Sequence, residues 1–246
     1  MIDEAQIVPY HPQPLPCSEG PWLIFAPHAD DETFGMGGTI ALATARGIQV
    51  ELVVVTDGAL GGSGDRATLI ATRQAEANAA AAILGIKQVH FLGQPDRGLR
   101  NDPGLQQQVA ALIRRTQARC VFFPGPCELH PDHRSCSLLI WDSCRLIDDS
   151  GLVLVSYEIT LQNPVNCLVD ITATRDVKDK ALQVYLSQLG ENNYADIVKG
   201  LNVLRTLTLS AQVKAAEGYY RYSLQERSMP LQAWLGEWVH RLLADS

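Results

Sequence analysis

Two short segments of the chain combine histidine with carboxylate side chains. The first, PHADDE, spans residues 27–32, and the second, HPDH, spans residues 130–133. Three of the six histidines of the chain lie in these two segments. Imidazole nitrogens and carboxylate oxygens suit Zn²⁺, and a catalytic zinc takes three protein ligands and leaves one position for water. Two histidines and one aspartate would meet that count and leave carboxylates for acid–base chemistry.

A fold must bring these segments together, because about a hundred residues separate them. Strands predicted at 22–28, 50–57, 89–93 and 120–125 alternate with helices predicted at 34–46, 67–84 and 104–117. This alternation predicts a parallel sheet with helices on both faces. With the strand order 3-2-1-4, the loops after the first and fourth strands face each other where the order reverses, and ligands bind at that point. Each histidine segment follows one of these two strands, so we expect one shared site.

The fold class predicted for the 246 residues is α/β: one Rossmann-like, three-layer domain over 1–246 with a mostly parallel sheet of order 3-2-1-4-5. A proline-rich arm over 1–21 is expected to be irregular. A helix near 135–147 and strand-like runs at 152–160 and 167–172 follow the fourth strand. The C-terminal part, 174–246, is predicted to be mostly helical, over 174–216 and 229–244.

Composition narrows the class of protein. Apolar residues make up 46% and charged residues 19% of the chain, which excludes intrinsic disorder. The formal net charge of −7 argues against a nucleic-acid partner. No apolar stretch is long enough for a transmembrane segment, and the N-terminus does not resemble a secretory signal, so we expect a cytoplasmic protein with reduced, structural cysteines. The sequence carries no indication of the oligomeric state.

Simpler interpretations of the two segments remain open at this point. The acidic run after the first strand is also typical of a helix N-terminus, and the His-Pro-Asp sequence is typical of a turn that starts a helix. A local metal site is a third possibility, since Cys127, His130, His133 and Cys136 are spaced C-x2-H-x2-H-x2-C. We disfavour it because structural zinc sites draw their ligand pairs from separated segments and a helix is predicted from about 135.

Two glycine-rich stretches are not phosphate-binding loops. Gly35, Gly37 and Gly38 do not follow the G-x-G-x-x-G spacing, and close packing of the first helix on the sheet explains them better. The loop 58–65 lacks the Lys-Ser/Thr of a P-loop. We expect this loop to form a flexible rim of the active site.

Several motifs together resemble the LmbE-like (PIG-L) deacetylases. PHADDE, TDG at 56–58 and HPDH carry the resemblance, and it is supported by R-x-x-E-A at 73–77, by FLGQPDRGL at 91–99, and by VDIT, K-x-x-A-L, Y-x-S-Q and AE towards the C-terminus. The similarity covers nearly all of 22–220. Members of this family are zinc-dependent hydrolases that remove the acetyl group from N-acetylglucosamine attached to lipids, inositol, malate or other aglycones.

The resemblance implies one zinc ion per chain, held by His28, Asp31 and His133. It implies that Asp30 is the general base, which takes a proton from the attacking water. It also implies that His130 stabilises the tetrahedral oxyanion and protonates the departing amine. Ala29 departs from the family pattern, which usually has proline at this position, but no ligand or base is lost.

The remaining implied roles concern orientation and substrate binding. Asp132 is expected to orient His130, and Arg73 and Asp96 are expected to hold sugar hydroxyls. The resemblance thus predicts removal of the acetyl group from an N-acetylglucosamine-containing small molecule or glycoconjugate. Two alternatives stay open: a metal-dependent amidase acting on another amide conjugate, and a degenerate, non-catalytic relative.

Overall fold

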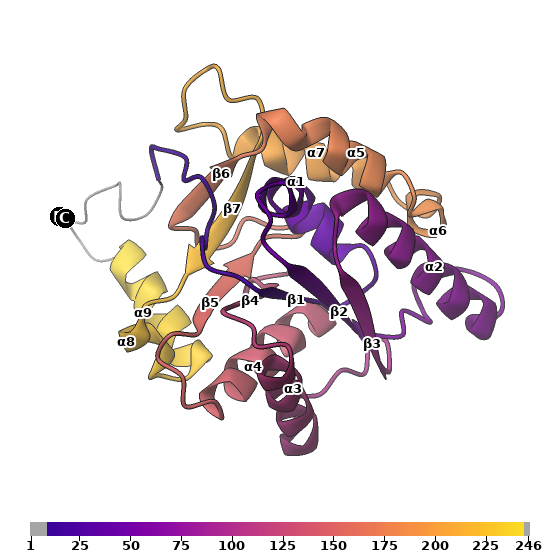
Figure 1. The fold of residues 1–246 in the computed structure, drawn as a ribbon, viewed down its shortest axis with the longest axis horizontal. Helices are drawn as coiled ribbons and strands as arrows, with labels where there is room; N and C mark the ends of the chain where they lie inside the picture. The colour runs from indigo at the N-terminus through magenta and orange to yellow at the C-terminus, as the bar shows by residue number, and fades with distance from the viewer. Residues whose placement is uncertain (1–8, 244–246) are drawn as a thin grey trace.

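The fold is that of a computed structural model, of which residues 9–243 are described. These residues form one seven-stranded sheet of order β3-β2-β1-β4-β5-β7-β6 (Figure 1). The strands are β1 (Trp22–Ala26), β2 (Val50–Thr56), β3 (Gln88–Gln94), β4 (Cys120–Pro124), β5 (Val153–Tyr157), β6 (Cys167–Asp170) and β7 (Ala216–Arg221). The predicted α/β class and the order 3-2-1-4-5 are confirmed. In the predicted arm, residues 9–21 form only an isolated bridge from Gln13 to Val169, and residues 1–8 lie outside the described part.

Strand β1 lies at the point where the strand order reverses. It pairs in parallel with β2 on one side and with β4 on the other, so that Trp22 stands opposite both Val50 and Cys120. All five of its residues are buried, as expected for a central strand covered on both faces. The carboxyl ends of β1 and β4 therefore lie side by side.

Residues 216–221 form a strand that was not predicted, and it lies almost entirely between the two segments predicted to be helical, 174–216 and 229–244. Strand β7 pairs antiparallel with both β5 and β6 and extends the parallel sheet at one edge. Its sequence, AEGYYR, has five buried residues in a row and so lacks the alternation of a strand that is half exposed. Pairing with two neighbours distant in sequence, which a local pattern cannot indicate, stabilises this segment as a strand.

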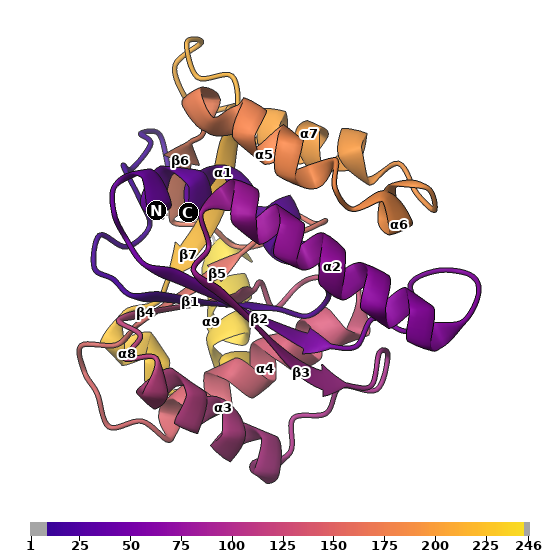
Figure 2. The ribbon, with the colours of Figure 1, turned by 45° about the vertical axis from the view of Figure 1, so that its right-hand side comes forward.

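Helices cover both faces of the sheet (Figure 2). On one face lie α1 (Asp31–Ala45), α2 (Arg66–Leu84), α5 (Arg175–Leu182) and α7 (Tyr194–Leu204), with the short α6 (Leu186–Leu189) and a 3₁₀ turn at Thr172–Thr174. On the other lie α3 (Pro103–Arg115), α4 (Pro131–Arg145), α8 (Leu224–Arg227) and α9 (Leu231–Leu243). Alternate residues of β1 enter the two apolar cores, Ile24 on the α1 side and Phe25 on the α4 side. No helix in the described range is both long and apolar enough to span a membrane.

Two helices begin earlier than predicted, and both place a histidine segment at a helix N-terminus. Helix α1 starts at Asp31 rather than near 34, and α4 starts at Pro131 rather than near 135. Proline suits the first position of a helix because it needs no N–H donor there. His130 is the N-cap of α4, and its Nδ1 accepts a hydrogen bond from the Asp132 N–H at 3.2 Å. The motifs therefore lie in the first turns of helices as well as after strands.

The glycines of α1 allow close packing, as predicted. A methyl group at Gly35 would collide with the Glu158 carbonyl oxygen, and one at Gly38 would lie 2.7 Å from the Ile171 Cβ. All six cysteines are free, and five of them are buried. This agrees with the prediction that the cysteines are small core residues rather than a disulfide framework.

Helix α1 is interrupted at Met36, whose φ and ψ of −144° and 17° are not helical. The Gly38 N–H donates to Glu217 Oε1 at 2.9 Å, and the Phe34 carbonyl accepts from Lys178 Nζ at 2.8 Å. In an unbroken helix these two backbone groups would bond to each other. Lys178 and Glu217 form a buried ion pair at 2.7 Å, so the pair bridges the break. The break thus depends on α5 and β7, the elements that carry the K-x-x-A-L and AE motifs.

We predict that Lys178→Met lowers the free energy of unfolding by about 3–5 kcal/mol, because it leaves the Glu217 carboxylate buried without its cation. Urea unfolding of the purified variant measures this change. The control is Lys199→Met, since Lys199 and Asp179 form a partly exposed pair at 3.7 Å; its effect should stay below about 1 kcal/mol. Equal effects of the two substitutions would contradict the bridging role.

Candidate active site and metal centre

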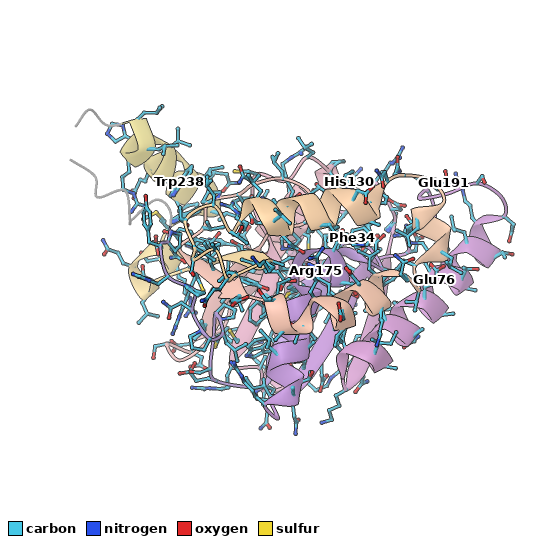
Figure 3. All side chains as sticks on the ribbon, turned by 90° about the horizontal axis from the view of Figure 1, so that it is seen from above. Phe34, Glu76, His130, Arg175, Glu191 and Trp238 are labelled. Atoms are coloured by element: carbon cyan, nitrogen blue, oxygen red, sulfur yellow. The ribbon has the colours of Figure 1, made fainter. Side chains whose placement is uncertain are left out.

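A cavity of about 670 Å³ opens at the carboxyl ends of β1 and β4. Seven of the eight predicted site residues line it, namely His28, Asp30, Asp31, Arg73, Asp96, His130 and His133. The predicted rim loop contributes Leu60 to Ser63 to the wall. Phe34, His130 and Glu191, which are labelled in Figure 3, line the cavity from α1, the β4–α4 loop and the segment after α6. The fold therefore brings the two histidine segments to one place.

Three donor atoms at the floor of the cavity form a nearly equilateral triangle. His28 Nδ1 lies 3.2 Å from Asp31 Oδ2 and 3.3 Å from His133 Nε2, and the latter two atoms are 3.3 Å apart. Three ligands bonded at about 2.0–2.1 Å to a tetrahedral ion are separated by roughly 3.3–3.4 Å. The side chains of these residues are at least nine-tenths buried. The donor set and its spacing fit a divalent metal ion.

His130 lies close enough to be an alternative ligand. Nitrogen atoms of His28, His130 and His133 lie within 4.8 Å of one another, a looser spacing than that of the triangle. Since His130 Nδ1 accepts the Asp132 N–H, the neutral ring carries its proton on Nε2. Burial, together with His28 and His133 nearby, lowers the pKa of His130. The ring is therefore suited to donate a hydrogen bond from Nε2.

The Asp132 carboxylate forms no hydrogen bond with His130, although it was expected to orient that ring. Its Oδ2 lies 3.3 Å from His28 Nε2 and accepts the Arg97 N–H at 2.6 Å, while its Oδ1 accepts the Leu99 N–H at 3.3 Å. Only its backbone N–H bonds to His130. Because His130 folds back as the N-cap of α4, the carboxylate of the second helical residue is directed to the 97–99 loop and His28. Asp132 thus orients His28, on the ring nitrogen opposite the triangle.

Arg73 and Asp96 line the cavity but bond to the protein. Arg73 donates to the Asp30 carboxylate at 3.3 Å and to the Ala29 and Gly58 carbonyls at 3.2 and 3.3 Å. Asp96 accepts the Leu60 N–H at 2.9 Å, and its other oxygen lies 3.4 Å from His28 Nε2. Their polar atoms therefore support Asp30, His28 and the rim loop, a use that the sequence did not indicate.

Asp30 has an unusual backbone and an unusual acidity. Its φ of 142° lies in a region that residues other than glycine rarely adopt, and such strain is concentrated at functional sites. Burial raises the pKa of Asp30 to about 7, and the Arg73 guanidinium offsets only part of this effect. A carboxyl group with this pKa exchanges protons near neutral pH.

Two of the three groups of the triangle, Asp31 and His133, favour a charged pair in the absence of metal. Burial opposes charge on Asp31 and on His133, but each stabilises the charged form of the other. The pKa of Asp31 is lowered well below its usual range, and the pKa of His133 is raised to about 9. A divalent cation would replace the histidine protons in balancing the Asp31 charge.

Some residues near the site were missed in the sequence. Glu128 is buried with Oε2 3.8 Å from His133 Nδ1; its only signal was a carboxylate two residues before HPDH. Gln188, Glu191, Asn192 and Tyr194 line the cavity from the part of the chain that was predicted to be a helical elaboration. The Y-x-S-Q motif was the available signal, since its Gln188 donates to the Gly61 carbonyl at 3.0 Å.

The local cysteine site is not formed. Cys136 is fully buried in the apolar core beneath α4. Within the described part of the chain, neither Cys136 nor Cys127 belongs to a cluster of potential metal ligands. Because α4 begins at Pro131, the helix directs Cys136 into the core and His133 into the cavity.

Comparisons with known proteins find similarity to deacetylases. The family model described as "PIG-L: GlcNAc-PI de-N-acetylase" matches residues 23–144. A diacetylchitobiose deacetylase of Thermococcus kodakarensis is 29% identical over 190 residues, which cover 69% of this chain and 70% of that protein. A probable N-acetyl-alpha-D-glucosaminyl L-malate deacetylase 2 of Bacillus anthracis is 34% identical over 121 residues, covering 45% of this chain and 53% of the relative.

A solved structure extends the similarity to most of the fold. The N,N'-diacetylchitobiose deacetylase of Pyrococcus horikoshii, solved with an inhibitor, superposes with a TM-score of 0.75 at 26% identity. The superposition covers 82% of this chain and 83% of that structure. The matched family region contains both histidine motifs and the strands β1 to β4 that bring them together. Residues 23–144 of the chain, with both histidine motifs, thus match the PIG-L (LmbE-like) family.

Proposed function

We propose that this protein is a zinc-dependent hydrolase that removes the acetyl group from an N-acetylglucosamine-containing small molecule or glycoconjugate. The observation that carries the proposal is the triangle of His28, Asp31 and His133 beside the buried carboxyl group of Asp30. The names of the relatives support the substrate class, since they are deacetylases of diacetylchitobiose and of an N-acetylglucosaminyl malate. The fold alone would not identify the reaction, because one fold hosts many activities.

The three residues of the triangle would hold the metal. A bound zinc ion supplies a Lewis acid that polarises a carbonyl and lowers the pKa of water. His28 and His133 offer neutral nitrogen donors, and Asp31 offers one negative oxygen. Asp132 and Asp96 hold the far nitrogen of His28, which fixes the orientation of its ring.

Asp30 is the proposed general base. Its carboxylate lies in the same cavity, directly before the ligand Asp31, and Arg73 holds one of its oxygens at 3.3 Å. Its ionised carboxylate can accept the proton of the attacking water and release it later in the cycle. We propose that Arg73 supports the reaction through Asp30 rather than by holding a sugar hydroxyl.

His130 is the proposed oxyanion donor and acid. Its Nε2–H is available to the cavity because the α4 cap engages Nδ1. This N–H can donate to the oxygen that becomes negative when the amide carbonyl is attacked. The ring can also protonate the amine nitrogen as the C–N bond breaks when it is an imidazolium with a second proton on Nδ1, and this transfer returns it to the neutral form. The cavity volume of about 670 Å³ falls in the usual range for small-molecule sites and accommodates a sugar with an aglycone.

The metal assignment predicts about one zinc or similar divalent ion per wild-type chain, measured by elemental analysis of the purified protein. His133→Ala should lose most of this metal because it removes one corner of the triangle. The matched control is Cys127→Ser, which changes a partly exposed potential ligand six residues away and should retain the metal. Loss of metal from the cysteine variant would instead support the local C-x2-H-x2-H-x2-C site.

The catalytic roles of Asp30 and His130 are tested by acetate release. The substrates are a panel of N-acetylglucosamine conjugates and one non-sugar amide. Asp30→Asn should keep its metal and lose about 10²- to 10⁴-fold in turnover, because an amide cannot accept the proton of water. His130→Ala should keep its metal and lose about 10²-fold or more. Asp179→Asn, which changes a partly exposed side chain on α5 outside the cavity lining, serves as the control.

Three results of this panel and of the metal analysis of the same variants would contradict parts of the proposal. An active Asp30→Asn enzyme would exclude the general-base role. Loss of metal from His130→Ala would favour the alternative trio of histidines. Preference for the non-sugar amide would indicate an amidase in place of a sugar deacetylase.

In the metal-free protein, the raised pKa of Asp30 should make the free energy of unfolding depend on pH. Between about pH 4 and 7 the folded chain keeps a proton on Asp30 that the unfolded chain has lost, so its free energy of unfolding falls as the pH rises. Asp30→Asn should therefore gain stability relative to wild type across this window, by at most about 4 kcal/mol. Urea unfolding at several pH values in the presence of a chelator measures the difference. A difference that stays constant with pH would contradict the raised pKa.

A further inference from the structure

The ring of His133 has one nitrogen without a hydrogen-bond partner. Its Nε2 faces His28 and Asp31 in the triangle. Its Nδ1 is fully buried and has no partner within hydrogen-bond distance among the described residues. Oε2 of Glu128 lies 3.8 Å from this nitrogen. A buried N–H without an acceptor costs about 1–3 kcal/mol, so this gap requires an explanation.

The chemistry of the proposed metal centre explains why His133 Nδ1 lacks a partner. A neutral histidine that binds a metal through Nε2 carries its proton on Nδ1. Histidine ligands almost always donate that second N–H to a carboxylate, a carbonyl or water, and this bond fixes the tautomer and the ring orientation. His28 already has such carboxylates, since its Nε2 lies 3.3 Å from Asp132 and 3.4 Å from Asp96. Glu128 is in the corresponding place for His133.

The Glu128 carboxylate is held firmly by neutral donors. Oε1 accepts the Ile159 N–H at 2.8 Å and the Asn163 side-chain N–H at 2.9 Å. Oε2 accepts the Thr160 hydroxyl at 2.9 Å and the Thr160 N–H at 3.2 Å. No lysine or arginine in the described range forms an ion pair with this carboxylate, which is almost completely buried. Its charge is therefore directed at His133 without a competing cation.

Asn163 ties the Glu128 segment to the rest of the fold. Its Oδ1 accepts the Cys127 N–H at 2.8 Å, and its own N–H donates to Glu158 at 2.7 Å. Glu158 in turn forms a buried ion pair with Arg205, whose guanidinium also donates to the Asn163 carbonyl at 3.0 Å. The loop between β5 and β6 and the end of α7 thus hold the residue that faces His133.

We infer that Glu128 is a positioning residue that accepts the Nδ1 proton of His133 and presents Nε2 of that ring to the metal. The inference rests on the metal centre of the proposed function. Closing the 3.8 Å gap to a hydrogen bond requires a movement of about 1 Å, which a small rotation of the His133 ring supplies when its other nitrogen is drawn to an ion. Glu128 does not contact substrate in this role, since it lies behind the ligand.

The test compares the zinc affinity of metal-free Glu128→Gln and wild type by competition with a chromophoric chelator. The amide keeps the size of the side chain but loses the charge, and zinc binding should weaken by about 10- to 100-fold. Glu226→Gln is the matched control, because this carboxylate also accepts several hydrogen bonds, from Ser223, Tyr220 and Trp234. Glu226 lies on α8 and does not line the cavity. Its affinity should stay within about twofold of wild type. A folded Glu128→Gln variant with the affinity of the control overturns the inference.

Nitrogen-15 NMR of histidine in zinc-loaded wild type provides a second readout that needs no Glu128 variant. The inference expects a slowly exchanging, strongly deshielded Nδ1–H for His133, assigned by its absence in His133→Ala. A zinc-bound His133 whose Nδ1 carries no proton, or carries one in fast exchange with water, overturns it. Where the Glu128→Gln variant folds, the signal of the His133 Nδ1–H should move upfield.

The two readouts separate this inference from the proposed activity. Neither uses turnover, so a chain that binds zinc but deacetylates no substrate still reports on Glu128. Loss of zinc in His133→Ala verifies the centre on which the inference rests. A wild-type chain that takes up no zinc overturns the inference together with the metal centre.

Discussion

The close approach of His28, Asp31 and His133 is the interaction on which the rest of the molecule depends. Three ionisable side chains lie within 3.3 Å of one another and are at least nine-tenths buried. Burying such groups is costly unless each is paired and correctly oriented. Much of the polar structure around the cavity can be understood as meeting this requirement. Carboxylates approach the outer nitrogens of both histidines, and the N-terminus of α1 carries the aspartate.

The sheet supplies the geometry that local structure cannot. The carboxyl ends of β1 and β4 are adjacent because the strand order reverses between them, so the loops that follow meet. Helices α1 and α4 begin directly after these loops and direct Asp31 and His133 into the same cavity. The break at Met36 lets α1 both reach the site and pack closely on the sheet. Lys178 and Glu217 replace the backbone bond that the break removes.

The part of the chain predicted as a helical elaboration is integral to the site. It contributes β7 to the sheet and residues from 188 to 194 to the cavity wall. Tyr185 donates to the buried Glu32 at 2.6 Å, and Ser187 bonds to Glu76 of α2. The scattered motifs K-x-x-A-L, Y-x-S-Q and AE therefore have one shared physical role. They support the first turn of α1 and the rim of the cavity from the outside.

The sequence was sufficient to predict the α/β fold and the strand order 3-2-1-4-5, from the alternation of strands and helices. The spacing of histidines and carboxylates in PHADDE and HPDH was sufficient to predict the family and one shared site for the two motifs. The motifs and the alternation are local in sequence, and the strand order is the one typical of a doubly wound sheet. The partners of Asp132, Arg73 and Asp96, the place of Glu128 and the strand β7 depended on the tertiary structure. Each involves a contact between residues that are tens of positions apart, or a side-chain direction set by a helix start a few residues from its predicted position. A single sequence contains no local signal for either, because hydrophobic periodicity reports which face of an element is buried and not which polar group it will meet there.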